Sequence, residues 1–508
     1  MKPILTPAEA TALDRESRAR GITVETLMEN AGREVGRAAA AVAGGFYGRR
    51  AVVVAGKGNN GGDGLVAARY LSRWGMRVAV VMLERGEDLR EPAATNLRRL
   101  AETDVRVRPF SLGVLERELG RADVAVDAIF GTGFRGMPEE AFAEAIAALG
   151  DADAPVVAVD IPSGVNGDSG AVEGVAVYAT VTVTFGAAKP GVVLFPGAEH
   201  AGLVEVVDIG FPGDLVRSRL ALLEATDVAA ALPPRATDTH KRAAGVVAVV
   251  GGSRRMTGAV TLAGEAAYRA GAGLVSVAVP ASILPVVQAI LREPTFVPLE
   301  ETDAGTVASG DDLFDRVVAD ADAVAVGPGM TTDERTASFV RSFVRTSPAP
   351  VVLDADGLNA FVGHVADLAD RKSALVMTPH AGEFARLVGT TVSEVGADRV
   401  AHARRLAAET EAVVLLKGSR TVIASPDGTA VVNPTGGPYL ATGGTGDVLT
   451  GVIAAFVARG VSPGDAAASA AYVHGVAGRL AGRELGDGTT AGDVLRKIPA
   501  ALREVGAA

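Results

Sequence analysis

Short apolar runs alternate with helical stretches along the first half of the chain. An amphipathic stretch at residues 138–150 places its apolar residues at helical spacing. Val-rich strands that alternate with helices indicate a mostly parallel sheet covered on both faces. The pattern therefore predicts a doubly wound, Rossmann-like α/β sheet for this half. The predicted strands are residues 51–55, 77–83, 123–129, 156–161, 180–185 and 203–209.

A second series of apolar runs begins after the double proline at residues 233–234 and the polar stretch that follows it. Three helices are predicted to close the chain, starting near Gly446, Gly464 and Thr490. Neither half repeats the other, so two different folds are joined. We expect one domain over residues 1–220 and another over residues 221–508. The predicted strands of the second half are residues 245–253, 274–280, 322–330, 350–357, 374–380 and 412–419.

Composition narrows the possible functions. A chain of 508 residues is too long for one ordinary core, which agrees with two domains. The net charge of −11 argues against a nucleic-acid-binding surface, because such surfaces need clustered Lys and Arg. The absence of cysteine excludes disulfides, thiolate zinc sites and a Cys nucleophile. No apolar run has the length of a membrane span and the first residues do not resemble a signal peptide, so we expect a cytoplasmic protein without a membrane partner.

The stretch GKGNNGGDG at residues 56–64 follows a predicted strand and has the glycine spacing of a dinucleotide-binding turn. Glu84 ends the next strand, where an acid that binds ribose would belong. Asp63 opposes this interpretation, because a carboxylate in the turn would repel pyrophosphate. A dinucleotide site, an ordinary tight turn and a site for a cation or a hydroxylated ligand all remain open at this point.

Two further strand ends supply polar groups near this turn. Loops that follow the carboxyl ends of parallel strands converge on one crevice of an open sheet. Asn60, Asp127 and Ser163 would then bring an amide, a carboxylate and a hydroxyl or carbonyl oxygen to one point. Such a shell of hard oxygen atoms suits a monovalent cation better than a transition metal.

The motifs LMENAG (27–32), GNNGGDG (58–64), DAIFGTGFRG (127–136), DIPSGVNGDSG (160–170) and FGAAKPG (185–191) together resemble the NAD(P)H-hydrate epimerase domain over roughly residues 1–215. The resemblance implies that potassium is bound by Asn60, Asp127 and Ser163. Asp160 is our candidate proton donor and acceptor, and a cap of the turn before Pro162 is the alternative. For Lys189 a structural role is the stronger interpretation, since an ion pair or a backbone contact would explain it as well as a functional role. The residues that the resemblance assigns to the hydrated nicotinamide nucleotide are Asn59, Asn60, Gly61, Gly62, Asp63, Gly131, Thr132, Gly133, Phe134, Arg135, Gly136, Met137 and Asp160.

The segment ATGGTGDVLTG at residues 441–451 carries the chemistry expected of the second half. Backbone N–H groups of Gly444, Thr445 and Gly446 at a helix start form an anion-binding site. Asp447 follows in the first turn. In phosphoryl transfer such amides stabilise the moving phosphoryl group, while the carboxylate accepts the proton of the attacking hydroxyl. An acidic residue in the first turn of an ordinary helix is the alternative interpretation.

With VVGGS (249–253), VGPGM (326–330), DADGLNAF (354–361), TPHAGEFARL (378–387) and LLKGSRTVI (415–423), this segment resembles the ADP- or ATP-dependent NAD(P)H-hydrate dehydratase, a member of the ribokinase-like fold, over roughly residues 225–508. Pro438-Tyr439 departs from the pattern expected before the glycines. The resemblance implies Mg2+ with the nucleotide phosphates near Glu383. It assigns the adenine nucleotide to Lys417, Gly418, Ser419, Arg420, Thr421 and Gly446, and the hydrated dinucleotide to Gly273, Gly329, His380 and Asp447.

The sequence thus predicts a bifunctional enzyme that repairs hydrated NADH and NADPH. One domain would interconvert the R and S epimers, and the other would dehydrate the S form at the expense of ADP or ATP. Assembly as a homo-oligomer is expected. Two alternatives stay open: a ribokinase-like kinase of a small alcohol whose N-terminal domain confers specificity, and a nucleotide-sensing scaffold without turnover.

Overall fold

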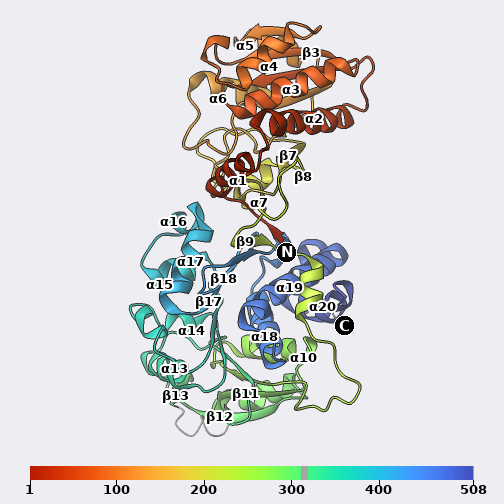
Figure 1. Cartoon of the computed structure of the whole chain (residues 1–508). Coiled ribbons are helices and arrows are strands. Elements are labelled where there is room, and N and C mark those ends of the chain that lie inside the picture. The colour runs from red at the N-terminus through yellow and green to blue at the C-terminus, as the bar shows by residue number, and fades with distance from the viewer. Residues whose placement is uncertain (310–317, 507–508) are drawn as a thin grey trace. The chain divides into compact units, whose positions relative to one another are not determined.

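The computed structural model describes residues 1–309 and 318–506, and the chain separates into two compact units (Figure 1). The N-terminal unit comprises Pro3–Ser218. The C-terminal unit comprises Arg219–Ala508 together with Met1–Lys2. Within the described ranges no helix is both long and apolar enough to cross a membrane.

The N-terminal unit is built on a seven-stranded sheet in which every pair of neighbouring strands is parallel. Its strand order is β4-β3-β2-β5-β6-β7-β8. The strands are β2 (Arg50–Ala55), β3 (Arg77–Met82), β4 (Arg106–Pro109), β5 (Val124–Ala128), β6 (Val156–Val159), β7 (Val181–Phe185) and β8 (Leu203–Val207). The helices are α1 (Pro7–Ala19), α2 (Val24–Val42), α3 (Asn59–Arg73), α4 (Ala93–Leu100), α5 (Leu112–Leu119), α6 (Glu140–Gly150), α7 (Pro190–Val193) and α8 (Gly197–His200), with the short 3-10 helix η1 (Gly86–Asp88).

Helices cover both faces of this sheet, because alternate residues of its central strands enter different cores. Val53 of β2 packs in a core with Val35 of α2 and Leu65 of α3. Its neighbour Val54 packs in a second core with Ile146 of α6. The prediction of a doubly wound sheet is confirmed. The strand order reverses between β2 and β5, and this switch point is where ligands bind in such sheets.

The C-terminal unit contains a twelve-stranded sheet in the order β1-β9-β19-β18-β17-β16-β15-β14-β10-β11-β12-β13. Parallel pairing runs from β17 to β12, while β18 pairs antiparallel to both of its neighbours and β13 pairs antiparallel to β12. The strands are β1 (Lys2–Pro3), β9 (Leu220–Leu222), β10 (Val246–Val250), β11 (Leu274–Pro280), β12 (Thr295–Glu301), β13 (Val307–Ser309), β14 (Ala323–Val326), β15 (Val351–Leu353), β16 (Leu375–Met377), β17 (Val413–Leu416), β18 (Val422–Ala424) and β19 (Ala430–Val432).

Helices of the C-terminal unit follow most of these strands. The α-helices are α9 (Ala225–Ala231), α10 (Thr257–Arg269), α11 (Leu284–Ile290), α13 (Glu334–Thr346), α14 (Asp356–Asn359), α15 (Ala381–Val388), α16 (Val392–Ala397), α17 (Arg399–Thr410), α18 (Thr445–Ala458), α19 (Pro463–Leu485) and α20 (Ala491–Glu504). The 3-10 helices are η2 (Ala281–Ile283), η4 (Val365–Leu368), η5 (Pro438–Leu440) and η6 (Gly486–Gly488). The three closing helices begin within one residue of their predicted starts.

The centre of this unit is the helix α18, which is buried along nearly all its length. Its residues Val448 to Ala458 are all buried, so the helix has no solvent face beyond its first turn. The neighbouring α19 is rich in alanine and glycine and buries most of one long face. Small residues let the two helices approach closely, which explains the high content of alanine and glycine in the last third of the chain.

Candidate functional site

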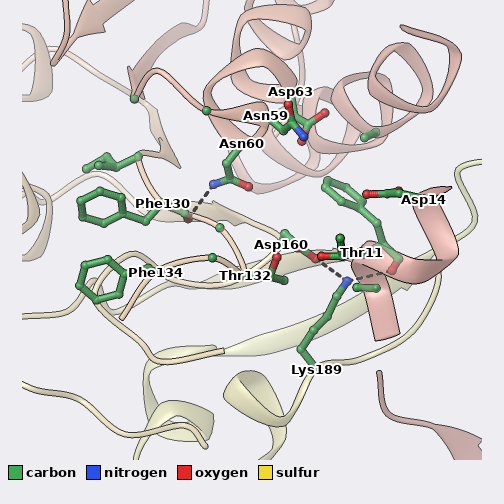
Figure 2. A pocket seen from close by; sticks show the side chains of 18 of the residues that line it. Thr11, Asp14, Asn59, Asn60, Asp63, Phe130, Thr132, Phe134, Asp160 and Lys189 are labelled. Carbon is green, nitrogen blue, oxygen red and sulfur yellow. Dashed lines mark hydrogen bonds and ion pairs between the residues drawn. The ribbon is translucent and has the colours of Figure 1, made fainter. Parts of the chain in front are cut away.

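A cavity of about 770 Å³ opens at the carboxyl ends of β2, β5, β6 and β7 in the N-terminal unit (Figure 2). Helices α1 and α2 close it with side chains such as Thr11, Asp14 and Met28. The structure places most of the predicted substrate-binding residues in its wall. Those that line it are Asn59, Asn60, Asp63, Gly131, Thr132, Gly133, Phe134, Arg135, Met137 and Asp160.

A buried ion pair lies at the base of this cavity. The Lys189 ammonium nitrogen lies 2.6 Å from Asp160 Oδ1, and it also donates to the carbonyl of Phe185 over 2.9 Å (Figure 2). Asp160 accepts a further hydrogen bond of 2.9 Å from the Thr184 hydroxyl. The backbone of Asp160 adopts a φ of 63°, a left-handed conformation that is unusual for a residue other than glycine. Such strain concentrates at functional sites, where the surrounding structure maintains it.

Two more carboxyl groups face this pair. Burial raises the pKa of Asp63 well above its usual value, and the negative charges of Asp160 and Asp14 add to the effect. Burial also raises the pKa of Asp14, on α1, although Arg18 opposes the shift. Asp14 was not predicted from the sequence, because it lies in no motif and reaches the cavity only through the position of α1. At the base of the cavity, Lys189 therefore lies near the carboxyl groups of Asp14, Asp63 and Asp160.

The glycines of the GNNGGDG turn have packing roles that differ from one another. A Cβ on Gly61 would lie 1.9 Å from the carbonyl oxygen of Gly56, and one on Gly62 would lie 2.5 Å from Cε of Met28. Gly61, Gly62 and Gly136 are not among the residues that line the cavity. The turn thus needs Gly61 and Gly62 for close approach of α3 to β2 and α2, while Asn59, Asn60 and Asp63 face the cavity.

The three residues predicted to bind a cation meet around the backbone of Phe130. Asn60 Nδ2 donates to the Phe130 carbonyl over 2.8 Å, and the Phe130 amide donates to Ser163 Oγ over 2.9 Å. Ser163 in turn donates to the Asp127 carboxylate, from its amide over 2.8 Å and from its hydroxyl over 2.6 Å. Burial raises the pKa of Asp127 to about 6, although the hydrogen bonds from Ser163 lower it. A nearby cation would favour the ionised carboxylate.

Aromatic rings and an arginine line the loop that follows β5. The rings of Phe130 and Phe134 stack with centroids 4.5 Å apart, and Phe130 also contacts Phe142 of α6. Arg135 forms an exposed ion pair with Asp168. Met137 is 71% exposed. This loop offers apolar ring faces and a positive group to one side of the cavity, as a flat, charged ligand would require.

In the C-terminal unit, Asp447 lies in the first turn of α18. Gly444 precedes the helix with a φ of 92°, so the amides that follow it turn toward one side of the helix start. Burial raises the pKa of Asp447 to about 7, the negative charge of Asp354 adds to the rise, and Lys417 opposes it. A carboxyl group with a pKa near neutrality is well suited to accept a proton from a substrate hydroxyl.

A network of charged groups lies beside this turn and was not predicted as a unit. Lys417, which follows β17, places its ammonium nitrogen 2.7 Å from Asp354 Oδ1 and 3.7 Å from Glu383 Oε2. The hydroxyl of Thr450, on α18, donates to the other oxygen of Asp354 over 2.7 Å. Burial alone would raise the pKa of Asp354, yet the charge of Lys417 holds it below its usual value.

The predicted nucleotide loop, residues 417–421, is fixed through its backbone. Arg399 of α17 donates to the carbonyls of Leu416, Ser419 and Arg420. The Arg420 guanidinium donates to the carbonyl of Pro434 over 3.1 Å, and the Thr421 hydroxyl donates to the carbonyl of Gly418 over 2.9 Å. Arg399 was missed in the sequence, where a basic residue at a helix start has no distinguishing pattern.

The residues predicted to contact the hydrated dinucleotide fall in two places. Gly329 follows β14 and His380 follows β16, both at the carboxyl ends of parallel strands. His380 Nδ1 accepts from the amides of Gly382 and Glu383, so this histidine caps α15 while its ring stays exposed. Gly273 precedes β11 at the opposite end of the sheet, where a Cβ would lie 1.8 Å from the Lys241 carbonyl. The structure therefore does not bring Gly273 to the others.

The Pro438-Tyr439 departure has a packing explanation. Tyr439 lies in η5, and its ring covers Gly482 of α19 so closely that a Cβ there would be 2.0 Å from Tyr439 Cδ2. The bulky residue is thus accommodated by a glycine on the facing helix.

Comparisons with known proteins match both halves. The family described as YjeF-related protein N-terminus matches residues 24–191, and the family described as NAD(P)H-hydrate dehydratase matches residues 247–500. The bifunctional NAD(P)H-hydrate repair enzyme Nnr of Moorella thermoacetica is 44% identical over 99% of this chain and 97% of its own length. The protein of the same name from Thermofilum pendens is 41% identical over 98% of this chain and 95% of its own length.

Among solved structures, an ADP/ATP-dependent NAD(P)H-hydrate dehydratase from Bacillus subtilis, co-crystallised with ATP and Mg2+, is 31% identical. The match covers 56% of this chain and 98% of that chain, with a TM-score of 0.48.

A Rossmann-like sheet with a cavity at its switch point, joined to an α/β domain with a glycine-rich helix start, defines a class of two-domain α/β enzymes. The fold class predicted from the sequence is confirmed. Within that class, the chain belongs to the family of bifunctional NAD(P)H-hydrate repair enzymes, as the relatives matched over nearly its full length show.

Proposed function

We propose that this protein returns hydrated NADH and NADPH to their active forms in two steps. The N-terminal unit interconverts the R and S epimers, and the C-terminal unit dehydrates the S form at the expense of ADP or ATP. The observation that carries the proposal is the 44% identity to a bifunctional repair enzyme over 99% of this chain. The contents of the two sites are consistent with it.

Epimerisation requires that the hydroxyl on C6 of the reduced nicotinamide ring leave and return, or that the ring open and close. Either route needs a proton acceptor and a proton donor close to C6. Asp160, paired with Lys189, is the proposed acceptor. Asp63 faces the same cavity with a pKa raised by burial, so it is suited to act as the proton donor.

A potassium ion fits the shell formed by Asn60, Asp127 and Ser163. The Asn60 amide nitrogen donates to the Phe130 carbonyl, which leaves the amide oxygen available. Asp127 is a completely buried carboxylate whose hydrogen-bond partners among the described residues are Ser163 and the Ile129 amide. These oxygen donors suit a hard cation of low charge. The ion would neutralise buried charge beneath the loop that holds Phe130 and Gly131.

Dehydration requires a better leaving group than hydroxide. Asp447 would accept the proton of the C6 hydroxyl while the oxygen of that hydroxyl attacks the terminal phosphorus of the nucleotide. Amides at the start of α18 would stabilise the transferred phosphoryl group. Loss of phosphate from C6 and of a proton from C5 then restores the C5–C6 double bond. Glu383 supplies a carboxylate near this place for Mg2+, which would neutralise charge on the nucleotide phosphates.

The proposal is tested by incubating the protein with mixed epimers of hydrated NADH or NADPH, with ADP or ATP, and following the absorbance of the reduced ring. Complete conversion of both epimers is expected. Conversion of the S epimer alone would contradict the role of the N-terminal unit. Release of an intact phosphorylated product would favour a small-alcohol kinase, and nucleotide binding without turnover would favour a scaffold.

We further propose that the protein works in the cytoplasm as a homo-oligomer. The cysteine-free chain is compatible with a reducing compartment, and most oligomers of soluble proteins are built from identical chains. Light scattering after size-exclusion chromatography measures the assembly directly.

A further inference from the structure

The ammonium group of Lys417 lies beside the first turn of α18. A Cβ placed on Gly446 would be only 3.4 Å from Lys417 Nζ and 3.9 Å from Asp354 Oδ2. The resemblance assigns the KGSRT loop to the adenine nucleotide. The side chain of Lys417, however, lies beside Gly446 in the first turn of α18, which suggests a role beyond holding the nucleotide. It is directed to the place where Asp447 and the amides of α18 meet.

We propose that Lys417 is a catalytic residue of phosphoryl transfer, whose ammonium group contacts the transferred phosphoryl group at the start of α18, and that Asp354 is the residue that positions it. This inference rests on the proposed dehydratase function and assigns a specific role within that site.

Asp354 is well suited to this positioning role. It follows β15, its side chain is almost completely buried, and its two oxygens bind different elements. One accepts from Lys417 after β17, and the other accepts from Thr450 on α18. A single carboxylate thus fixes the lysine relative to the helix whose amides would hold the phosphoryl group. A side chain that is already fixed loses little conformational freedom when the ligand arrives.

The carboxyl groups gathered around the site favour a positively charged group beside the phosphoryl group. Asp447 lies near the carboxyl groups of Asp354, Asp356 and Glu383, so four carboxyl groups would surround a phosphoryl group bound there. The other positive groups of this loop are occupied elsewhere, because Arg420 donates to the carbonyl of Pro434 and Arg399 donates to loop carbonyls. Lys417 is thus a cation that lies beside the start of α18.

The test compares Lys417→Met with the unchanged protein in two measurements, kcat for dehydration at saturating nucleotide and the Kd for ADP and ATP. We expect kcat to fall about 10²–10³-fold, as when one donor that stabilises transition-state charge is removed. The Kd is expected to change by less than about tenfold.

Asp354→Asn is expected to lower kcat by about 10–100-fold, the range typical of a supporting residue, with the Kd similarly preserved. Lys372→Met removes an exposed lysine of the same unit and serves as the matched control.

A second comparison separates charge from packing. Lys417→Arg keeps the positive charge and is expected to retain more activity than Lys417→Gln, which keeps only a hydrogen-bond donor. Equal losses in these two variants would overturn the inference, as would a large rise in Kd with kcat unchanged. Absence of dehydration in the unchanged protein would instead overturn the proposed function, so the two failures are distinguishable.

Discussion

Lys189 holds Asp160 by an ion pair of 2.6 Å in which the lysine side chain is almost fully buried and the aspartate nearly so. The contacts of this pair favour the catalytic interpretation of Asp160 over the turn cap, and that interpretation stays a prediction. Its side chain accepts from Lys189, Thr184 and the amide of Phe185, all of which lie downstream of its own turn. A carboxylate fixed at the base of a cavity is available to a ligand in a way that a turn cap is not.

Replacing Asp160 by Asn should abolish most epimerisation while leaving dehydration of the S epimer unchanged. The amide keeps the shape but cannot accept a proton, and loss of a general base typically costs about 10²–10⁴ in rate. Exchange between the epimers can be followed by chromatography without added nucleotide. Asp153→Asn, at an exposed position of the same unit, is the matched control. Epimerisation at the unchanged rate would exclude Asp160 as the proton acceptor.

Epimerisation should depend on potassium, and Asp127→Ala should remove that dependence together with most of the activity. Asp127 is the one full negative charge of the proposed shell, and it also holds the Ser163 backbone in place. Initial rates at increasing KCl, with choline chloride maintaining ionic strength, measure the effect. A melting curve of the variant distinguishes loss of the ion from loss of the fold. Rates that ignore potassium in the unchanged protein would contradict the site.

Asp447→Asn should lower the rate of dehydration by about 10²–10⁴-fold with little change in nucleotide affinity. The change removes the proton acceptor, whereas the loop after β17 and the amides of α18 remain. Isothermal titration with ADP and a progress curve with the S epimer give both quantities in one preparation. Loss of nucleotide binding would show that Asp447 is structural, and unchanged dehydration would show that it is not the base.

Dehydration should decline as the pH falls through about 7, because burial places the pKa of Asp447 there. The base works in its ionised form, which predominates above the pKa, so at one pH unit below it kcat/KM should be about one tenth of its plateau. Rates measured from pH 5.5 to 8.5 with the S epimer test this direction. The residual activity of Asp447→Asn should lack this decline. A profile that rises toward acid would contradict the assignment.

Gly61→Ala should destabilise the N-terminal unit more than Gly62→Ala does. The new Cβ would meet a backbone oxygen at 1.9 Å in the first variant, but the flexible end of Met28 in the second. Overpacking of this kind costs about 1–3 kcal/mol, and the methionine can move aside. Thermal melting of both variants measures the difference. Equal stabilities would contradict the close packing of the turn described above.

The central strands were predictable because Val-rich runs buried on both faces leave an unambiguous pattern. Strand β4 was not, since each of its four residues, Arg106 to Pro109, is exposed and two are arginines. Strands β9, β18 and β19 are three residues long and were also missed, whereas the equally short β15 and β16 lie within predicted apolar runs. Short and edge strands depend on the neighbours to which they bond, and those neighbours are fixed only in the folded chain.

The prediction of site residues from the sequence was also limited to those that lie in recognisable motifs. Residues within glycine-rich motifs, such as Asn60 and Asp447, could be proposed as site residues from the sequence because the motif itself specifies their position. Asp14 lies in no motif and reaches the cavity only through the position of α1, while Asp354 lies in the motif DADGLNAF but its partners Lys417 and Thr450 come from distant segments. The sequence also could not separate glycines that face the cavity, such as Gly131, from those required for packing, such as Gly61.

The burial of α18 has a consequence for selectivity. Because its residues after the first turn are enclosed by the core, the amides at its start cannot follow a phosphate that arrives out of place. The amides at the start of α18 therefore have a fixed position. They stabilise fully a phosphoryl group that is in line with the attacking hydroxyl, and they stabilise much less one that is displaced by a fraction of an ångström. Rigidity of the scaffold would thus limit wasteful hydrolysis of the nucleotide when a substrate of the wrong shape, or water alone, occupies the site.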